Sequence, residues 1–366
     1  MVETTRFHRI APANLHRAIM LVFKQVGSSE REQRLTADHL VAANLTGHDS
    51  HGVGMIPAYL QAAAEKKLVI NARHTVAVDA GPILTIDGGM GLGQVIAFDA
   101  MNQAIERARQ HGVCMLGIRN AHHTGRIGHW SEQCAAAGFV SMHYVAGFAG
   151  VTSVAPFGGR ETRFQTNPYS AGFPLPGRPP IILDFATSKI AMGKVRVARN
   201  KGEQVPPNTL IDAEGRPSRD PNVMYAPPGQ RGALFTFGEH KGSGLAIICE
   251  LFAGALNGGG TTYPGNYENR PITNSMLSII VEPSRLGGGA SVGQEATRFI
   301  DWVKSSKPLP GVDEVLVAGE PERRRAKRER DGIPVDATTW NDVTKAAEAT
   351  GLTKAELDKA AGLHNA

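Results

Sequence analysis

The spacing of apolar residues changes twice along this 366-residue chain, and the two changes limit the folds open to it. Up to about residue 74, and again from about residue 306, apolar residues recur at the spacing of amphipathic helices. Between these parts, short apolar runs alternate with further helical patterns, which favours an α/β layer structure. We therefore predict a helical domain made from residues 1–74 and 306–366, with an α/β domain of residues 75–305 inserted in it.

The individual elements follow from periodicity, caps and turn residues. Predicted helices share apolar residues at helical spacing and in several cases end at a glycine. They cover residues 14–26, 29–45, 57–67, 94–110, 130–137, 242–256, 292–304, 339–349 and 354–361. Predicted strands are short apolar runs bounded by turn residues. They are 75–78 and 83–86, expected to form a hairpin, and 113–118, 139–145, 181–185 and 276–281.

Composition excludes several classes of protein. Hydrophobic residues make up 42% and charged residues 20%, as in globular rather than disordered chains. The longest apolar stretch, 245–256, contains Glu250 and is too short for a membrane span. Three widely spaced cysteines argue against a disulfide framework and a cysteine-rich zinc site. They favour a reducing cytoplasm, as does the polar segment 1–10, which lacks the apolar region of a signal peptide.

Much of the net charge of +5 comes from the run 323–330, which contains six arginine and lysine residues. A nucleic-acid patch is one interpretation of such a run. Acidic residues flank it, however, and no aromatic residues are interleaved with it to stack on bases. We therefore expect a solvated helical face.

Gly89, Gly91 and Gly93 lie between a predicted strand and a helix, where a Rossmann dinucleotide fingerprint would begin. Neither Gln94 nor Ile96 supplies the small third residue that close packing of helix and strand requires. We therefore predict a glycine-rich turn and no Rossmann fold.

The 13 histidines raise the alternative of a metal-dependent hydrolase. His48 and His51 are three residues apart, a spacing compatible with zinc ligands on one helical face. No His-Glu-x-x-His motif occurs, and no acidic residue has a familiar metal spacing. We expect no metal site.

Two polar segments carry groups for proton transfer and anion binding. Residues 47–53 place His48, Ser50 and His51 at a helix end, and imidazole exchanges protons near neutral pH. A simple helix cap is the alternative role for this segment. Residues 119–128 follow a predicted buried strand and include His123 and Arg126, a residue type that binds carboxylates with two hydrogen bonds.

Two further segments are suited to a nucleotide. Residues 184–188 run from a strand into Asp184, Ala186, Thr187 and Ser188, where a carboxylate could bind a ribose and a helix start could bind phosphate. Residues 238–242 place His240 and Lys241 at the start of an apolar helix.

Taken in order, six short segments resemble the type-2 malate/L-lactate dehydrogenase family, which includes ureidoglycolate, diketogulonate and sulfolactate dehydrogenases. They are 50–52, 123–125, 156–159, 166–168, 184–187 and 240–242. The resemblance covers nearly the whole chain. It implies a non-Rossmann, mixed-sheet NAD(P)-binding fold, a homodimer, and reversible hydride transfer between a nicotinamide and a 2-oxo or 2-hydroxy acid, in the cleft between the two predicted domains.

The resemblance also implies roles for individual residues. His51 or His123 would transfer the proton, and Ser50 would help to hold the substrate oxygen. His48 would lie at the substrate. The cofactor would lie along a set of residues from several segments: Asn167, Pro168, Asp184, Ala186, Thr187, Ser188, His240, Lys241, Gly319 and Glu320. The cofactor is NAD or NADP, and both histidines remain candidates for proton transfer.

One departure from the family bears on the substrate. Many relatives carry an arginine four residues after the histidine matching His51, where this chain has Met55. Because a buried carboxylate needs a partner, we predict that Arg126 supplies it. Met55 would widen the pocket and favour a larger or aromatic 2-oxo acid. A cyclic imine of the Δ1-piperideine-2-carboxylate type is the alternative substrate.

Overall fold

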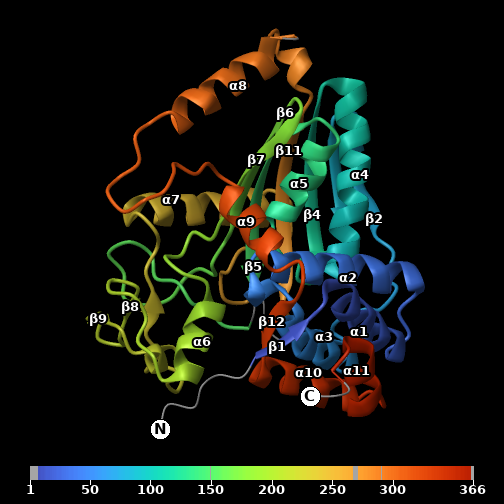
Figure 1. Cartoon of the computed structure of the whole chain (residues 1–366), viewed down its shortest axis with the longest axis vertical. Helices are drawn as coiled ribbons and strands as arrows, with labels where there is room; N and C mark the ends of the chain where they lie inside the picture. The colour runs from blue at the N-terminus through green and yellow to red at the C-terminus, as the bar shows by residue number, and fades with distance from the viewer. Residues whose placement is uncertain (1–6, 149, 267–270, 290, 364–366) are drawn as a thin grey trace.

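The computed structural model describes residues 7–148, 150–266, 271–289 and 291–363. A seven-stranded sheet forms its centre, with the strand order β2-β3-β4-β11-β5-β6-β7 (Figure 1). In the described strands, β3 and β4 pair in parallel and all other neighbours are antiparallel. The predicted mixed α/β class is confirmed. The strands are β2 (Thr75–Ala80), β3 (Ile83–Asp87), β4 (Val113–Ala121), β5 (Val140–Phe148), β6 (Tyr169–Leu175), β7 (Arg178–Phe185) and β11 (Thr273–Val281).

Helices cover both faces of this sheet. On one face, α4 (Gly93–His111) and α5 (Gly128–Ala136) bury apolar side chains against alternate residues of β4, including Leu116 and Ile118. On the other face lie α7 (His240–Cys249) and the π-helical turn that continues it (Glu250–Ala255). Asn257, which follows this turn, lies so close to β4 that a Cβ built on Gly117 would be 2.7 Å from its Oδ1. The glycine lets this segment lie close to the strand.

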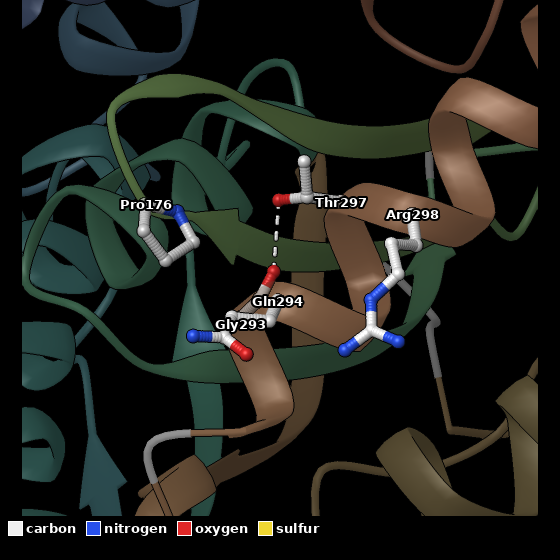
Figure 2. Close-up of a pocket in the computed structure, with 5 residues that line it drawn as sticks. All are labelled: Pro176, Gly293, Gln294, Thr297 and Arg298. Carbon is white, nitrogen blue, oxygen red and sulfur yellow. Dashed lines mark hydrogen bonds between the residues drawn. The ribbon is translucent and has the colours of Figure 1, made fainter.

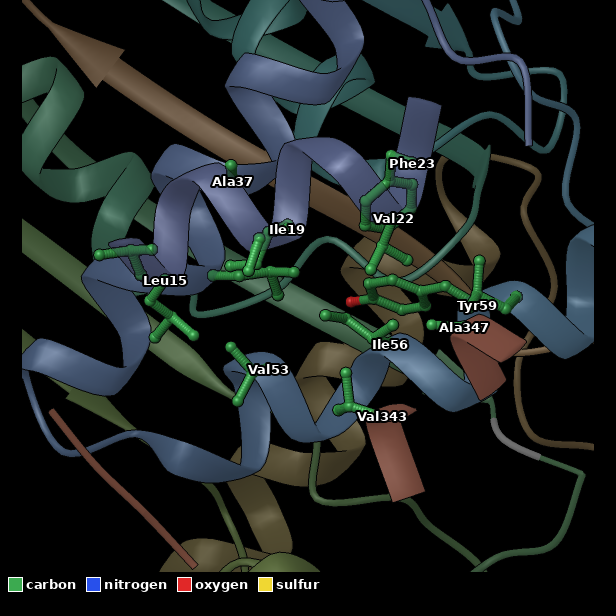
Figure 3. Packing of buried hydrophobic residues seen from close by; sticks show 14 of the residues in the cluster. Leu15, Ile19, Val22, Phe23, Ala37, Val53, Ile56, Tyr59, Val343 and Ala347 are labelled. Atoms are coloured by element: carbon green, nitrogen blue, oxygen red, sulfur yellow. The ribbon is translucent and has the colours of Figure 1, made fainter. Parts of the chain in front are cut away.

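The two ends of the chain share a second apolar core. α1 (Pro12–Gln25), α2 (Glu30–Leu45) and α3 (Ile56–Ala64) pack with α10 (Ala337–Glu348) and α11 (Lys354–Ala361). Figure 3 shows Val343 and Ala347 of α10 beside Ile56 and Tyr59 of α3. In addition, β1 (Phe7–Ile10) pairs antiparallel with β12 (Ile333–Asp336). The division into two domains at residues 74 and 306 stays a prediction.

Several elements differ from the sequence prediction. The predicted helix 242–256 begins two residues earlier and changes to π-helix at Glu250. The sequence patterns did not predict β1, β6 or β12. They also did not predict the following elements: α6 (Met192–Lys201), the small sheet of β8 (Leu210–Ile211), β9 (Pro217–Ser218) and β10 (Ala233–Leu234), and the 3-10 turns Asp49–His51, Val53–Met55, Pro221–Tyr225 and Pro283–Leu286. The basic run 323–330, expected as a helical face, lies largely in α9 (Glu320–Arg328). α8 (Ser291–Lys304) agrees with its predicted range.

The basic run lies largely in α9, where acidic groups and carbonyl oxygens surround it. Arg324 pairs with Glu314, and Arg325 Nη2 lies 3.5 Å from Asp49 Oδ2. Arg323 donates to the carbonyl oxygen of Pro180, 3.0 Å away. These contacts fit the predicted helical face. In the described ranges, no helix is both long and apolar enough to cross a membrane.

Candidate active site

The loop after α2 is built around the side chain of Asn44. Its Oδ1 accepts from the Val53 N–H at 2.9 Å, and its Nδ2 donates to Asp49 Oδ1 at 2.8 Å. A Cβ on Gly52 would lie 2.1 Å from Asn44 Oδ1, so only glycine fits there. These contacts hold the turn that carries His51.

His51 meets His123, which follows the end of β4. His51 Nδ1 and His123 Nε2 are 3.1 Å apart, and the rings stack with centroids 5.2 Å apart. Burial, together with the nearby charges of His48 and Arg126, lowers the pKa of His51 to about 4. Burial, with the charge of His51, holds the pKa of His123 well below its usual value. Both imidazoles are therefore neutral at pH 7 in the free protein.

Two residues that the sequence did not indicate complete this chain of contacts. Tyr59 of α3 places its hydroxyl 2.5 Å from His123 Nδ1, and Gln94 of α4 donates from Nε2 to the same hydroxyl at 2.8 Å. A Cβ on Gly93 would lie 2.2 Å from the carbonyl oxygen of His122. The glycine turn therefore lets α4 begin against the backbone of the histidine segment, which brings Gln94 into place.

Arg126 is only 2% exposed and is near enough to His51 for its charge to lower the pKa of that residue. Its guanidinium pairs with Glu132, and Nη1 lies 3.8 Å from Asp184 Oδ2. Burial raises the pKa of Asp184, whereas the charges of His48 and Arg126 oppose that rise. His48 Nε2 lies 3.8 Å from Glu322 of α9. The predicted Arg126 and Asp184 thus lie close together, and His48 and Arg126 are near enough to His51 for their charges to lower its pKa.

Ser50 lies against α6. A Cβ on Gly193 would lie 2.4 Å from Ser50 Cβ, so α6 rests directly on this turn. One helical turn further on, Arg196 Nη2 would lie 3.4 Å from a Cβ on Gly54. Met55 packs against the apolar core of the chain ends. The structure therefore adds an exposed arginine, Arg196, near the position where the sequence has Met55.

Three of the predicted cofactor-binding side chains, those of Asn167, Thr187 and Ser188, make hydrogen bonds within the protein. Asn167 is fully buried and donates to Glu250 Oε1 at 2.7 Å. Thr187 Oγ1 donates to the Thr166 carbonyl oxygen at 3.0 Å, and Ser188 Oγ to that of Ile190 at 2.8 Å. The Pro168 carbonyl oxygen accepts a hydrogen bond from the Val145 N–H, and Ala186 follows the end of β7. Gly319 precedes α9 with a φ of +88°, and Glu320 pairs with Lys304.

His240 and Lys241 are exposed at the start of α7, beyond Gly238 and Glu239, both of which have positive φ. No hydrogen bond or ion pair within the described residues engages the Lys241 ammonium. The helix start and these two side chains suit an anionic group.

The surface hollow in Figure 2 lies elsewhere. It is formed by the β6–β7 turn and α8, and Pro176, Gly293, Gln294, Thr297 and Arg298 line it. It contains none of the predicted site residues. In the part of the chain that the structure describes, no group of three or more histidine, cysteine, aspartate or glutamate residues is placed to hold a metal ion.

Comparison with known proteins gives the family. A family model described as malate/L-lactate dehydrogenase matches residues 10–344. Hydroxycarboxylate dehydrogenase B of Escherichia coli K12, to which segments 43–52 and 133–141 indicate a likeness, is 46% identical, with 96% of each chain covered. L-lactate dehydrogenase of Cupriavidus necator is 37% identical over 86% of this chain and 90% of its own. The solved sulfolactate dehydrogenase of Methanocaldococcus jannaschii is 30% identical with a TM-score of 0.83, over 94% of this chain and 98% of that one. This chain therefore belongs to the malate/L-lactate dehydrogenase family.

Proposed function

We propose that this oxidoreductase interconverts a 2-oxo acid and a 2-hydroxy acid with NAD or NADP. The observation that carries the proposal is the contact between His51 and His123, together with the buried Arg126, whose charge acts on His51. The reaction needs a proton-exchanging group and a cation for the substrate carboxylate. The family relationship supports the same reaction, since the similar proteins include hydroxycarboxylate and lactate dehydrogenases.

The cofactor would supply or accept the hydride at C2 of the substrate. The exposed His240 and Lys241 at the start of α7 fit its phosphate groups in charge. Asn167, Thr187 and Ser188 would shape the backbone against which it lies, because their side chains are engaged internally. We propose a cofactor site that is not of the Rossmann type, and the antiparallel pairings throughout most of the sheet support this.

The chain's own groups would handle the proton and the substrate's charge. His51 would give a proton to the alkoxide oxygen during reduction and take it back during oxidation, with Ser50 holding the same oxygen. Arg126 would attract the substrate carboxylate, with His48 beside it. Met55 would leave space for a larger or aromatic side chain on the 2-oxo acid.

The test follows absorbance as NADH or NADPH is oxidised with pyruvate, oxaloacetate, 2-oxoglutarate and phenylpyruvate. Turnover with phenylpyruvate at the highest kcat/KM would support both the reaction and the role of Met55. A preference for pyruvate would contradict that role. Turnover only with a cyclic imino acid would instead support the alternative substrate, a cyclic imine of the Δ1-piperideine-2-carboxylate type. Metal bound to a purified protein that oxidises neither nucleotide would favour the metal-dependent hydrolase.

We also propose a homodimer in the cytoplasm. α8 has no buried residue, and its Phe299 and Trp302 are 56% and 71% exposed. Apolar side chains of that size are typical of surfaces that a partner covers. Light scattering of the purified protein should give twice the 39.0 kDa mass of the chain, and a monomer would contradict the proposal.

A further inference from the structure

The chain of contacts His51–His123–Tyr59–Gln94 carries an inference beyond the pairing of the two histidines. We propose that Tyr59 and Gln94 are positioning residues that fix which ring nitrogens of His123 and His51 carry hydrogen, and that His51 Nε2 alone exchanges the proton with the substrate. The inference rests on the proposed function for the identity of the substrate, but the contacts on which it stands are independent of it.

The occupancy of the ring nitrogens assigns the two histidines different roles. His123 uses both of its nitrogens, Nε2 toward His51 and Nδ1 toward Tyr59. His51 uses only Nδ1, and its Nε2 has no hydrogen-bond partner in the described part of the chain. The residue is also partly exposed. A substrate oxygen can therefore reach His51 Nε2, whereas His123 acts on the substrate only through His51.

The Gln94 amide determines which partner donates in each hydrogen bond from Tyr59 to His51, because an amide has one donating and one accepting end. When Nε2 donates to Tyr59, the Tyr59 hydroxyl donates to His123 Nδ1 and His123 Nε2–H donates to His51 Nδ1. His51 then carries its single proton on Nε2. It cannot gain a second one at Nδ1, since two N–H groups would face each other.

With the amide turned over, Gln94 Oε1 accepts from Tyr59 and every bond reverses. His51 then carries hydrogen on Nδ1 and presents an open Nε2, which accepts the hydroxyl proton of a 2-hydroxy acid. The protonated ring fits the same arrangement and returns the proton to the alkoxide in the reverse reaction. In the first arrangement, Gln94 Oε1 is buried and has no partner within the described residues. The two ends of the amide have nearly the same shape, so the site also accommodates this second arrangement, and it is the one that the inference requires.

Apolar packing holds the Tyr59 ring in place, so its hydroxyl stays in contact with His123. The Tyr59 ring is fully buried among Val22, Phe23, Ile56 and Val343, as Figure 3 shows. Burial also raises the pKa of its hydroxyl, which therefore stays protonated. Tyr59 thus orients its neighbours as a neutral donor and acceptor and does not become a base.

The test compares three variants. Tyr59→Phe keeps the ring and removes the link, and Gln94→Met keeps the shape and removes both polar ends. We expect each to lower kcat by about 10- to 100-fold, a part of what general acid–base catalysis supplies, while KM changes less than about 2-fold. Gln94→Glu keeps an accepting end. It should retain kcat within about 5-fold, and its added negative charge should move the pH midpoint of kcat/KM upward.

The charged and titratable groups around His51 are His48, His123, His39 and Arg126, and all three variants keep them. A purely structural role for Gln94 predicts equal losses in Gln94→Met and Gln94→Glu with an unchanged midpoint, and this result would overturn the inference.

A second measurement does not depend on turnover. Nitrogen-15 NMR of labelled histidines distinguishes the two neutral tautomers. The wild type should show one defined tautomer each for His51 and His123, and Tyr59→Phe should show a mixture. Unchanged tautomers in Tyr59→Phe would refute the inference even if the enzyme turns over 2-oxo acids. A defined tautomer in a protein without turnover would leave the inference standing and refute the proposed function instead.

Discussion

At the scale of single residues, the site concentrates positive charge and partly balances it before a substrate arrives. Arg126 is buried, pairs with Glu132, and lies near Asp184. Arg196 lies over Gly54, is exposed, and has no ion-pair partner among the described residues. The predicted role of Arg126 requires that its charge still attract a carboxylate from within this cluster.

Replacing Arg126 with methionine tests that requirement. We expect KM for the 2-oxo acid to rise by about 10- to 100-fold, the effect of losing a hydrogen bond to a charged group. The matched variant is Arg196→Met, which removes the same type of side chain from α6. Steady-state kinetics of both variants show which arginine binds the substrate carboxylate. A KM that rises only in Arg196→Met would assign this role to Arg196 and not to Arg126.

The low pKa of His51 gives the site a defined pH dependence. Oxidation of a 2-hydroxy acid needs neutral His51, and the pKa of about 4 keeps it neutral down to mildly acidic pH. We therefore expect kcat/KM for oxidation to be level from about pH 6 to 8 and to fall about tenfold per unit below about pH 4. A midpoint near the ordinary histidine value of about 6.5 would contradict the burial that the structure shows.

The sequence could indicate the side chains that we propose as reactive but not those that we propose to orient them. Ser50, His51 and His123 lie in short polar segments next to glycine, and such segments can be recognised without a fold. Tyr59 and Gln94 lie within apolar helical patterns, where the expected role of each is packing. Their contacts join residues 64 and 35 positions apart, so only the fold brings them to the histidines.

At the scale of elements, the turn that carries Ser50 and His51 lies directly against α6. Gly193 faces Ser50 at a distance that leaves no room for a methyl group. The sequence patterns missed α6 because its basic and polar residues give no apolar stripe, with Val195 as its fully buried residue. They also missed β1 and β12, since each is only four residues long and gains its partner from the other end of the chain.

Gly193→Ala should displace α6 from the Ser50 turn, because the new Cβ would lie 2.4 Å from Ser50 Cβ. We expect kcat/KM to fall by at least about tenfold, since small displacements of positioned groups cost activity. The control is Gly244→Ala, which meets no atom within 4 Å and lies within α7. The control should keep its activity, and equal kinetics in both variants would show that contact with α6 is unimportant.

At the scale of the whole molecule, the fold buries many histidines in the neutral form. Burial lowers the pKa of several that lie outside the paired rings: His39, His122, His129 and His143. His143 is fully buried in the central sheet between Ser141 and Ser278, with a pKa of about 3. The alternation of elements predicted an α/β layer structure, but polar residues on the inner strands gave no sign that they would be buried so completely.

These histidines should make the protein sensitive to acid. In the unfolded chain each has a pKa of about 6.5, so from about pH 6.5 down to about pH 4 the unfolded state binds more protons and stability falls. For His143 the difference amounts to about 2 kcal/mol between pH 7 and pH 5. His143→Gln keeps a side chain that can bond to both serines and removes the titration. Urea unfolding at the two pH values should therefore show a loss of stability smaller by about 2 kcal/mol than in the wild type. The control is His111→Gln at an exposed position, which should lose as much stability between pH 7 and pH 5 as the wild type. Equal losses of stability in all three proteins would show that protonation of His143 does not destabilise the folded state.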